Sequence, residues 1–319
     1  MRLKQQGIAL LTALVLLALC TVIATALAFA AGFAIRRAEG TTAFDQAWQA
    51  AGAAEAFAAY ALDDDSRGGS NDDFPGEVWT RTLPPTEVSP GVTLSGQLKD
   101  LQGRFNLNQL VDGNGVADTF AIDEFKRLLR GLHIDDHYAD LMADWIDTDN
   151  SPLPNGAEDS FYSGQPIPYL PPNRPITSSS ELMALPGFSA ELFTTLSPYV
   201  TALPRDTLIN TCFAAGEVLD ALTNSQQWSG PNGAQALAKL RGSKCFPDRN
   251  TFMASFFGSS IDRTKLEAQI ATQSRFFSLR SVISIGSTEF ALYSLLMRDK
   301  QTPGAGPATV RVITRSFTE

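Results

Sequence analysis

Carboxylate side chains between residues 131 and 173 are the groups in this chain best suited to bind an ion. The stretch contains no lysine or arginine. Crowded carboxylates repel one another unless they face water or a cation. The later ones flank a loop rich in proline, glycine and asparagine, whose backbone carbonyls add the hard oxygen ligands that Ca²⁺ prefers. The acidic residues of the stretch are Asp135, Asp136, Asp140, Asp144, Asp147, Asp149, Glu158 and Asp159.

This pattern predicts a structural calcium site, and the alternative is a solvated acidic loop. The spacing does not fit an EF-hand, because no glycine lies at the sixth loop position and no glutamate at the twelfth. The two ends of the loop supply the expected ligands. These are Asp144, Asp147, Asp149, Glu158 and Asp159.

A second acidic loop offers Asp112, Asn114 and Asp118 as weaker candidate ligands for a cation. Val116 stands where an oxygen ligand would be needed. A turn that leads into a helix at Phe120 is therefore the favoured alternative.

The two histidines of the chain, His133 and His137, are four residues apart and could share one face of a helix. A hydrolytic zinc site needs a third ligand and a general base, and the sequence HIDDH lacks the HExxH arrangement. Two ordinary exposed histidines explain the sequence as well. Because the chain also lacks GxSxG, SxxK and P-loop motifs, we do not expect an enzyme.

The N-terminus predicts a membrane span. Residues 1–7 are polar and basic, and residues 8–35 carry no charge. As a helix these residues would extend about 42 Å, more than the ~30 Å hydrocarbon core of a bilayer. A cleaved signal peptide is the alternative, since Ala24, Ala26 and Ala28 imitate a cleavage site. Its apolar region, however, is typically only about 7 to 15 residues long.

The helical pattern continues beyond the span, over residues 36–62, as an amphipathic segment that ends in a charged, glycine-rich breaker at residues 63–71. Such a helix is suited to packing beside similar helices and then under a sheet. A signal anchor with a helical stalk is the alternative. The apolar positions are Ala43, Ala47, Ala50, Ala51, Ala54, Phe57, Ala58 and Leu62.

Composition limits the classes of partner. With 319 residues and 44% hydrophobic content, the chain is long enough for one or two packed domains. Without Arg2 and Lys4 the 25 basic residues fall to 23 against 34 acidic ones, a net charge of −11. We therefore do not expect a nucleic acid partner.

The rest of the chain divides into strand-like ends around a helical middle. Alternation of apolar and polar residues indicates one antiparallel sheet, with turns at Ser287 and Thr288 and over residues 302–308. The expected strands cover residues 93–98, 277–285, 289–297 and 309–315. The expected helices cover residues 120–132, 138–146, 180–185, 189–196 and 214–223.

These patterns predict an α+β fold in which a long N-terminal helix packs on an antiparallel sheet. We expect residues 63–107 and 273–319 to form the α/β body, and residues 108–272 to be a large inserted α-helical domain. Cys212 and Cys245 are a candidate disulfide pair, and two buried free thiols are the alternative.

Three segments resemble the K-type minor pseudopilins of type II secretion systems. They are GIALLTALVLLALCTVIATAL from Gly7, DLQGRFNLNQL from Asp100, and DWIDTDNSPLPNGAEDSFY from Asp144. Gly7 before Ile8 resembles the site that prepilin peptidases cut. The resemblance implies cleavage after Gly7, methylation of the new amine of Ile8, a pilin-like fold with an inserted helical domain, and calcium bound in this acidic region.

Thr12 is the fifth residue after the expected cut, where major pilins and pseudopilins carry glutamate. In the family picture that carboxylate pairs with the N-terminal amine of a neighbouring subunit, since unpaired charge in lipid is costly. The alternative is one tolerated polar residue. A subunit without this carboxylate suits the end of the fibre.

The resemblance further implies an inner-membrane, single-pass protein with a periplasmic body. Its partners would be the I-type and J-type minor pseudopilins and other pseudopilins, and together they would start and cap the pseudopilus that exports folded proteins. We expect partner helices to contact the face of Ala47, Ala51 and Ala54.

An alternative function is a signal-anchored periplasmic binding module. The sequence SELMALPGFSAELF, from Ser180, resembles a helix-hairpin-helix, and residues 208–222 resemble its companion half. Only Arg205 is basic between Arg174 and Lys239, so the charge needed to bind a phosphate backbone is missing. A packing module for protein contacts is favoured.

Overall fold

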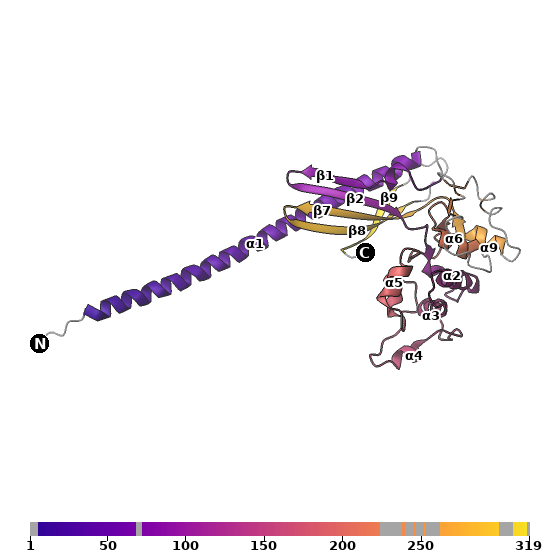
Figure 1. The fold of residues 1–319 in the computed structure, drawn as a ribbon, viewed down its shortest axis with the longest axis horizontal. Helices are drawn as coiled ribbons and strands as arrows, with labels where there is room; N and C mark the ends of the chain where they lie inside the picture. The colour runs from indigo at the N-terminus through magenta and orange to yellow at the C-terminus, as the bar shows by residue number, and fades with distance from the viewer. Residues whose placement is uncertain are drawn as a thin grey trace.

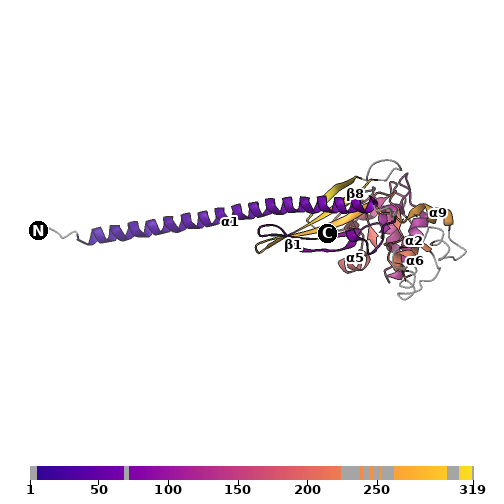
Figure 2. The ribbon, with the colours of Figure 1, turned by 90° about the horizontal axis from the view of Figure 1, so that it is seen from above.

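The computed structural model describes residues 6–67, 72–223, 238–239, 241, 245–246, 252, 262–299 and 309–317, with side chains from Ile8 onward. Helix α1 (Gln6–Arg67) dominates the shape, and its N-terminal half extends alone from the body (Figures 1 and 2). This half is long and apolar enough to cross a membrane, with a mean hydropathy of 2.7 and none of its best window buried. The expected membrane span is therefore a free helix in the structure.

The second half of α1 packs on the sheet through a stripe of alanines. Ala47, Ala51 and Ala54 are almost fully buried there. The prediction that this face contacts partner helices is wrong, because the protein's own sheet covers it. The opposite face is exposed, and it consists of Gln49, Gly52, Ala53, Ala56, Phe57 and Tyr60.

Helix α1 also continues five residues beyond its predicted end at Leu62. Two local bonds stabilise this last turn: Arg67 pairs with Asp63 at 2.5 Å, and the Ser66 hydroxyl donates to the Asp63 carbonyl at 2.6 Å. Leu62 is fully buried. The aspartates are therefore part of the helix, and the predicted end at residue 62 was too early.

The sheet has five antiparallel strands in the order β1-β2-β7-β8-β9. The four predicted strands are confirmed, and the β7–β8 turn lies at Gly286 and Ser287, where Gly286 has φ +59°. Strand β1 was missed because Pro84 and Pro85 are unusual in strands, although an edge strand tolerates them. The strands are β1 (Leu83–Ser89), β2 (Val92–Asp100), β7 (Phe276–Ile285), β8 (Thr288–Arg298) and β9 (Val310–Ser316).

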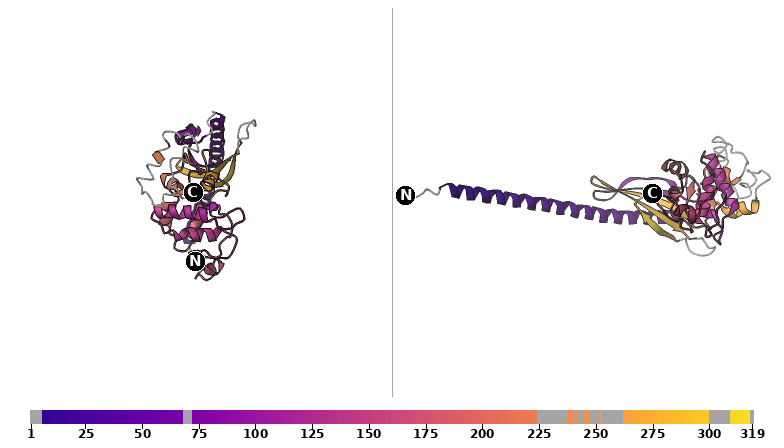
Figure 3. Two further views of the ribbon diagram at one scale, coloured as in Figure 1. Left: turned by 90° about the vertical axis from the view of Figure 1, so that its right-hand side faces the viewer. Right: turned by 90° about the horizontal axis from the view of Figure 1, so that it is seen from below.

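A helical region with its own hydrophobic core is inserted between β2 and β7 and lies beyond one end of the sheet (Figure 3). Phe105 and Phe125 stack in this core with ring centroids 5.3 Å apart. Two short parallel strand pairs, β3–β4 and β5–β6, support it. Its helices are α2 (Thr119–Gly131), α3 (His137–Ile146), α4 (Asp159–Ser163), α5 (Ala190–Leu196), α6 (Gly216–Thr223) and α9 (Arg263–Gln269). The shorter elements are η1 (Val78–Thr80), β3 (Phe105–Asn106), η2 (Leu107–Leu110), η3 (Ser179–Ala184), β4 (Val200–Thr201), β5 (Ile209–Asn210) and β6 (Ile270–Ala271).

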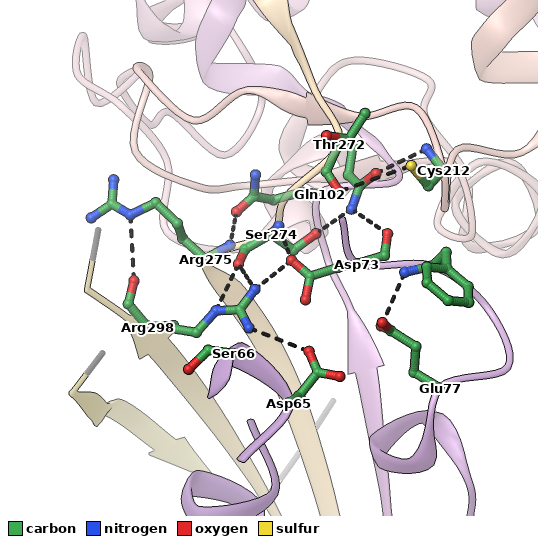
Figure 4. A network of polar contacts seen from close by, with 12 residues as sticks. Asp65, Ser66, Asp73, Glu77, Gln102, Cys212, Thr272, Ser274, Arg275 and Arg298 are labelled. Carbon is green, nitrogen blue, oxygen red and sulfur yellow. Dashed lines mark hydrogen bonds and ion pairs between the residues drawn. The ribbon is translucent and has the colours of Figure 1, made fainter. Parts of the chain in front are cut away.

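A polar network joins the sheet to the inserted region (Figure 4). Arg298 of β8 donates to the Asp73 carboxylate and to the Ser274 carbonyl. Nearby, Cys212 and Cys245 are joined in a disulfide with their Cα atoms 4.9 Å apart. The turn predicted over residues 302–308 lies outside the described residues.

Candidate metal centre

Three of the predicted ligands converge in the inserted region. Asp144 lies in the last turn of α3, Asp147 caps the C-terminus of that helix, and Glu158 precedes α4. One carboxylate oxygen from each lies within 4.8 Å of the other two, and the three residues are at most 3% exposed. Two ligands at about 2.4 Å from one Ca²⁺ are at most about 4.8 Å apart, so the spacing fits one ion.

Several of these carboxylate oxygens have no hydrogen-bond partner. Oδ1 of Asp147 and both Oε atoms of Glu158 are buried without one. The Asp144 carboxylate accepts a hydrogen bond from the Leu153 amide, at 3.3 Å to Oδ1 and 3.1 Å to Oδ2. Buried carboxylates are costly unless a cation or donors satisfy them. The group therefore needs either bound protons or a metal ion.

Burial raises the pKa of all three carboxyls, to about 7 for Asp144, about 6 for Asp147 and about 8 for Glu158. Repulsion between neighbouring carboxylates adds to the effect of burial, since each lies near others of the group. A divalent cation would reverse both effects. The electrostatics of the ion-free site thus favour binding of a hard cation.

Gly156 shapes the space beside the carboxylates. A Cβ atom at this position would collide with the Asp144 carboxylate. The loop approaches the carboxylate this closely only because residue 156 has no side chain.

Asp149 and Asp159 lie at the rim of the site rather than in the group of three. Asp149 is exposed, and its Oδ1 accepts from the Ser151 amide at 2.7 Å. Asp159 is half-buried at the start of α4. Both are near enough to raise the pKa of Glu158, so they add negative charge and remain candidate ligands.

Asp140, one turn before Asp144, already has a cation. Lys126 contacts its Oδ1 at 2.6 Å, and Asn155 donates to its Oδ2 at 3.1 Å. The three converging carboxylates differ from Asp140 in this respect, because none of them forms an ion pair with a described residue.

The second acidic loop, with Asp112, Asn114 and Asp118, does not bring its side chains together as ligands. Asp112 accepts from the amides of Asn114 and Val116, and Asp118 caps the N-terminus of α2. These are the interactions of a turn that leads into a helix, as the favoured alternative predicted. The loop nevertheless touches the site, since the Thr148 amide and hydroxyl both donate to the Gly115 carbonyl.

The histidines do not share a helix face. His133 has φ 58° in the turn after α2, whereas His137 begins α3 and pairs with Asp135 at 2.8 Å. Neither belongs to a cluster of metal-ligating side chains within the described residues. The turn of the helix-hairpin-helix-like segment is packed inward, with Phe188 buried and edge-on to Tyr138.

Aromatic side chains that sequence analysis did not consider surround the acidic group. Tyr162 of α4 is fully buried, its hydroxyl has no partner, and Asp144 and Glu158 add to the effect of burial in raising the pKa of its phenol. The Trp145 ring lies 5.3 Å from the Tyr162 ring. In the sequence, Trp145 directly follows the predicted ligand Asp144, and Tyr162 comes three residues after Asp159.

The predicted leader cleavage site lies at the start of α1. The helix begins at Gln6, so Gly7 and Ile8 belong to its first turn. The Thr12 hydroxyl donates to the Ala9 carbonyl at 3.0 Å, within its own helix. Thr12 is therefore satisfied locally.

Comparison with known proteins gives consistent matches. The family model "Type II secretion system (T2SS), protein K" matches residues 103–205. The type II secretion system protein K of Aeromonas hydrophila is 31% identical, over 93% of this chain and 94% of the relative. That of Pseudomonas aeruginosa is 32% identical, over 94% and 91%. A crystal structure of the GspK-GspI-GspJ complex from the type 2 secretion system of enterotoxigenic Escherichia coli matches with a TM-score of 0.73 and 25% identity, over 88% of this chain and 98% of that one.

Proposed function

The chain belongs to the type II secretion system protein K family, and from this premise we propose that it occupies the tip of the pseudopilus. There it helps to start assembly of the fibre that exports folded proteins across the outer membrane. The observation that carries this proposal is the inserted region. It widens the molecule at the end opposite the free half of α1 (Figure 1), and such a width would obstruct stacking of subunits within a fibre.

The membrane segment supports a tip position in a second way. Thr12 bonds to its own helix and has no carboxylate to pair with a neighbour's N-terminal amine. A subunit of this kind cannot take an interior position normally. Immunogold labelling of pseudopili tests the proposal: label at fibre ends supports it, and label along the shaft contradicts it. In the Thr12→Glu variant, but not in Thr12→Ala, label should move into the shaft.

For the membrane anchor, we propose a single-pass inner-membrane protein with a periplasmic body. A prepilin peptidase would cut after Gly7 and leave a methylated Ile8. N-terminal sequencing and intact mass of the protein from membranes, with and without the peptidase, test this. A chain that begins near Ala28, or that keeps Met1, would contradict it.

As partners we propose I-type and J-type minor pseudopilins, because the solved relative is a complex with GspI and GspJ. The exposed face of α1 fits a partner helix. Gly52, Ala53 and Ala56 permit close approach of a second helix, and Phe57 and Tyr60 flank them with exposed aromatic surface.

Cysteine crosslinking tests this face. Gly52→Cys and Ala56→Cys should form disulfides with cysteines placed in the partner helices, whereas Ala54→Cys, on the buried face, should not. Efficient crosslinking from Ala54→Cys alone would contradict the proposal.

We propose calcium as a structural ion bound by Asp144, Asp147 and Glu158, with Asp149 and Asp159 at the rim. The proposal is supported by the unpartnered buried oxygens and by their spacing. When bound, calcium would neutralise the carboxylates and hold α3 and α4 together. Calorimetric titration of the metal-free protein with Ca²⁺ tests this, and absence of binding would contradict it.

A further inference from the structure

Tyr162 lies between the acidic group and an exposed loop. Its side chain is fully buried, but its hydroxyl has no hydrogen-bond partner among the described residues. An unpaired buried hydroxyl is costly. The same residue belongs to α4, whose preceding residue is Glu158. The Tyr162 amide also donates to the Glu158 carbonyl at 3.3 Å, so the backbones of the two residues are directly linked.

The ring of Tyr162 also contacts the next part of the chain. It lies 5.1 Å from the ring of Tyr169, and the Tyr169 amide donates to the Tyr162 carbonyl at 3.5 Å. The Tyr169 hydroxyl in turn donates to the Ala184 carbonyl at 2.9 Å. Tyr169 thus connects its loop to two elements, through one hydrogen bond to α4 and one to η3.

The loop attached in this way, residues 164–172, exposes large apolar side chains. Ile167 is 82% exposed and Leu170 is 61% exposed. Prolines at positions 166, 168, 171 and 172 restrict the backbone of the loop. Gln165 bonds to α4 at the start of the loop, and Pro171 is buried near its end. Between them, Tyr169 connects the exposed middle of the loop to α4 and η3.

We infer that Tyr162 is a positioning residue that orients the ion-binding carboxylates through its hydroxyl and transmits occupancy of the site through its ring to the loop of residues 164–172. The inference rests on the calcium proposed above. With the ion bound, the hydroxyl donates to a carboxylate oxygen of Asp144 or Glu158, and Tyr169 is held more firmly. Without the ion, repulsion between the carboxylates loosens α4 and the loop with it.

A matched pair of substitutions tests the role of the Tyr162 hydroxyl. In full-length protein in detergent, Tyr162→Phe should weaken Ca²⁺ binding about tenfold, as loss of an outer-shell group typically does. The matched control, Tyr169→Phe, removes a hydroxyl that faces Ala184 instead, and its affinity should equal that of the wild type. Titration calorimetry measures both.

Hydrogen exchange of the loop amides tests the coupling. Ca²⁺ should slow exchange at Ile167, Tyr169 and Leu170 at least severalfold in the wild type. In Tyr169→Leu the ion should still bind, but exchange in the loop should no longer respond to it.

The outcomes distinguish this inference from the proposed ion. If the wild type binds no Ca²⁺, both are wrong. If it binds Ca²⁺ but Tyr162→Phe binds as tightly, or if the loop exchanges equally with and without the ion, only the role of Tyr162 is wrong.

Discussion

The molecule contains two groups of three carboxylates that look alike in spacing but differ in charge balance. Asp65, Asp73 and Glu77 meet where α1 ends, and the second group meets in the inserted region; in each group the ligand atoms lie within 4.8 Å of one another. In the first group, seen in Figure 4, Asp65 and Asp73 pair with the buried guanidinium of Arg298. Among the described residues, no lysine or arginine pairs with the second.

This difference shows how a fold can satisfy buried acids in two ways. Arg298 pairs with Asp73, lies 3.8 Å from Asp65, and also donates to the Ser274 carbonyl. The Glu77 carboxylate accepts from the Trp79 indole at 2.8 Å and from the Phe74 amide at 3.1 Å. The first group is therefore neutralised in part by Arg298 of the protein itself, whereas the second group would need a cation from solution.

The largest expected effect comes from removing the internal cation. Arg298→Met leaves Asp73 buried without its partner, which typically costs about 3 to 5 kcal/mol. Urea unfolding of the full-length protein should record this loss, with or without Ca²⁺. The matched control is Arg311→Met, since the Arg311–Asp299 pair is exposed and an exposed pair contributes less than about 1 kcal/mol. Equal losses in the two variants would show that the junction does not depend on Arg298.

Removing a carboxylate from the second group should abolish the response to the external cation. At a free Ca²⁺ concentration of about 100 times Kd, the ion stabilises the folded protein by about 2.7 kcal/mol. Glu158→Gln should lose this increment, measured as the shift in thermal midpoint between calcium and a chelator. The exposed control Glu191→Gln should keep it. A full shift in Glu158→Gln would remove Glu158 from the site.

The space beside the carboxylates offers a test that leaves every charge in place. Gly156→Ala should weaken Ca²⁺ binding at least about tenfold, because the new Cβ would displace the Asp144 carboxylate. Gly164→Ala is the matched control, since a Cβ at that position would meet only ordinary contacts at 3.5 Å. Unchanged affinity in Gly156→Ala would place the ion elsewhere.

Acidity should weaken the binding of Ca²⁺ by the second group. Ca²⁺ binds the deprotonated carboxylates, and the ion-free pKa values are about 7 for Asp144 and about 8 for Glu158. Calcium affinity should therefore fall as the pH drops from about 8 to 6. Because these pKa values are raised by folding, ion-free protein should lose stability as the pH rises through the same range. Calorimetry and urea unfolding at several pH values measure both trends, and a pH-independent affinity would contradict the assignment.

Sequence alone predicted those parts of the fold whose pattern is local. Strands β2, β7, β8 and β9 alternate clearly, and the helices of the inserted region follow apolar periodicity. Strand β1 was hidden by two prolines. The pairing of Phe105 with Val200 was also hidden, because two-residue strands carry no periodic pattern.

The candidate site was predictable as far as composition reaches. The absence of basic residues around Asp144 indicated a cation site there, and three of the five predicted ligands converge. The group of Asp65, Asp73 and Glu77 was not predicted, because Arg298 follows Asp73 by 225 residues in the sequence. Only the fold brings these side chains together, so no spacing in the sequence could indicate the pair.

A single buried carboxylate tests how much of the pKa shift comes from burial alone. Glu124 of α2 is fully buried outside both groups, and burial raises its pKa to about 8 even though Arg127 opposes the shift. Its stabilising contribution is complete below the unfolded pKa and is lost as the pH rises toward 8. Glu124→Gln should remove this contribution and make the protein more stable than the wild type at pH 8, because ionising the buried wild-type carboxyl costs about 1.4 kcal/mol for each unit by which its pKa is raised.

The result would sharpen the contrast between the two groups. Gln269 of α9 lies 3.2 Å from both Glu124 carboxyl oxygens once its amide is oriented to donate, so a glutamine at position 124 keeps one polar partner. If urea unfolding of the calcium-loaded protein depends on pH as strongly in Glu124→Gln as in the wild type, Glu124 does not cause the dependence. If the dependence weakens, burial is the main cause of the raised pKa of Glu124, and repulsion within the group of three comes in addition, which a bound ion would have to offset.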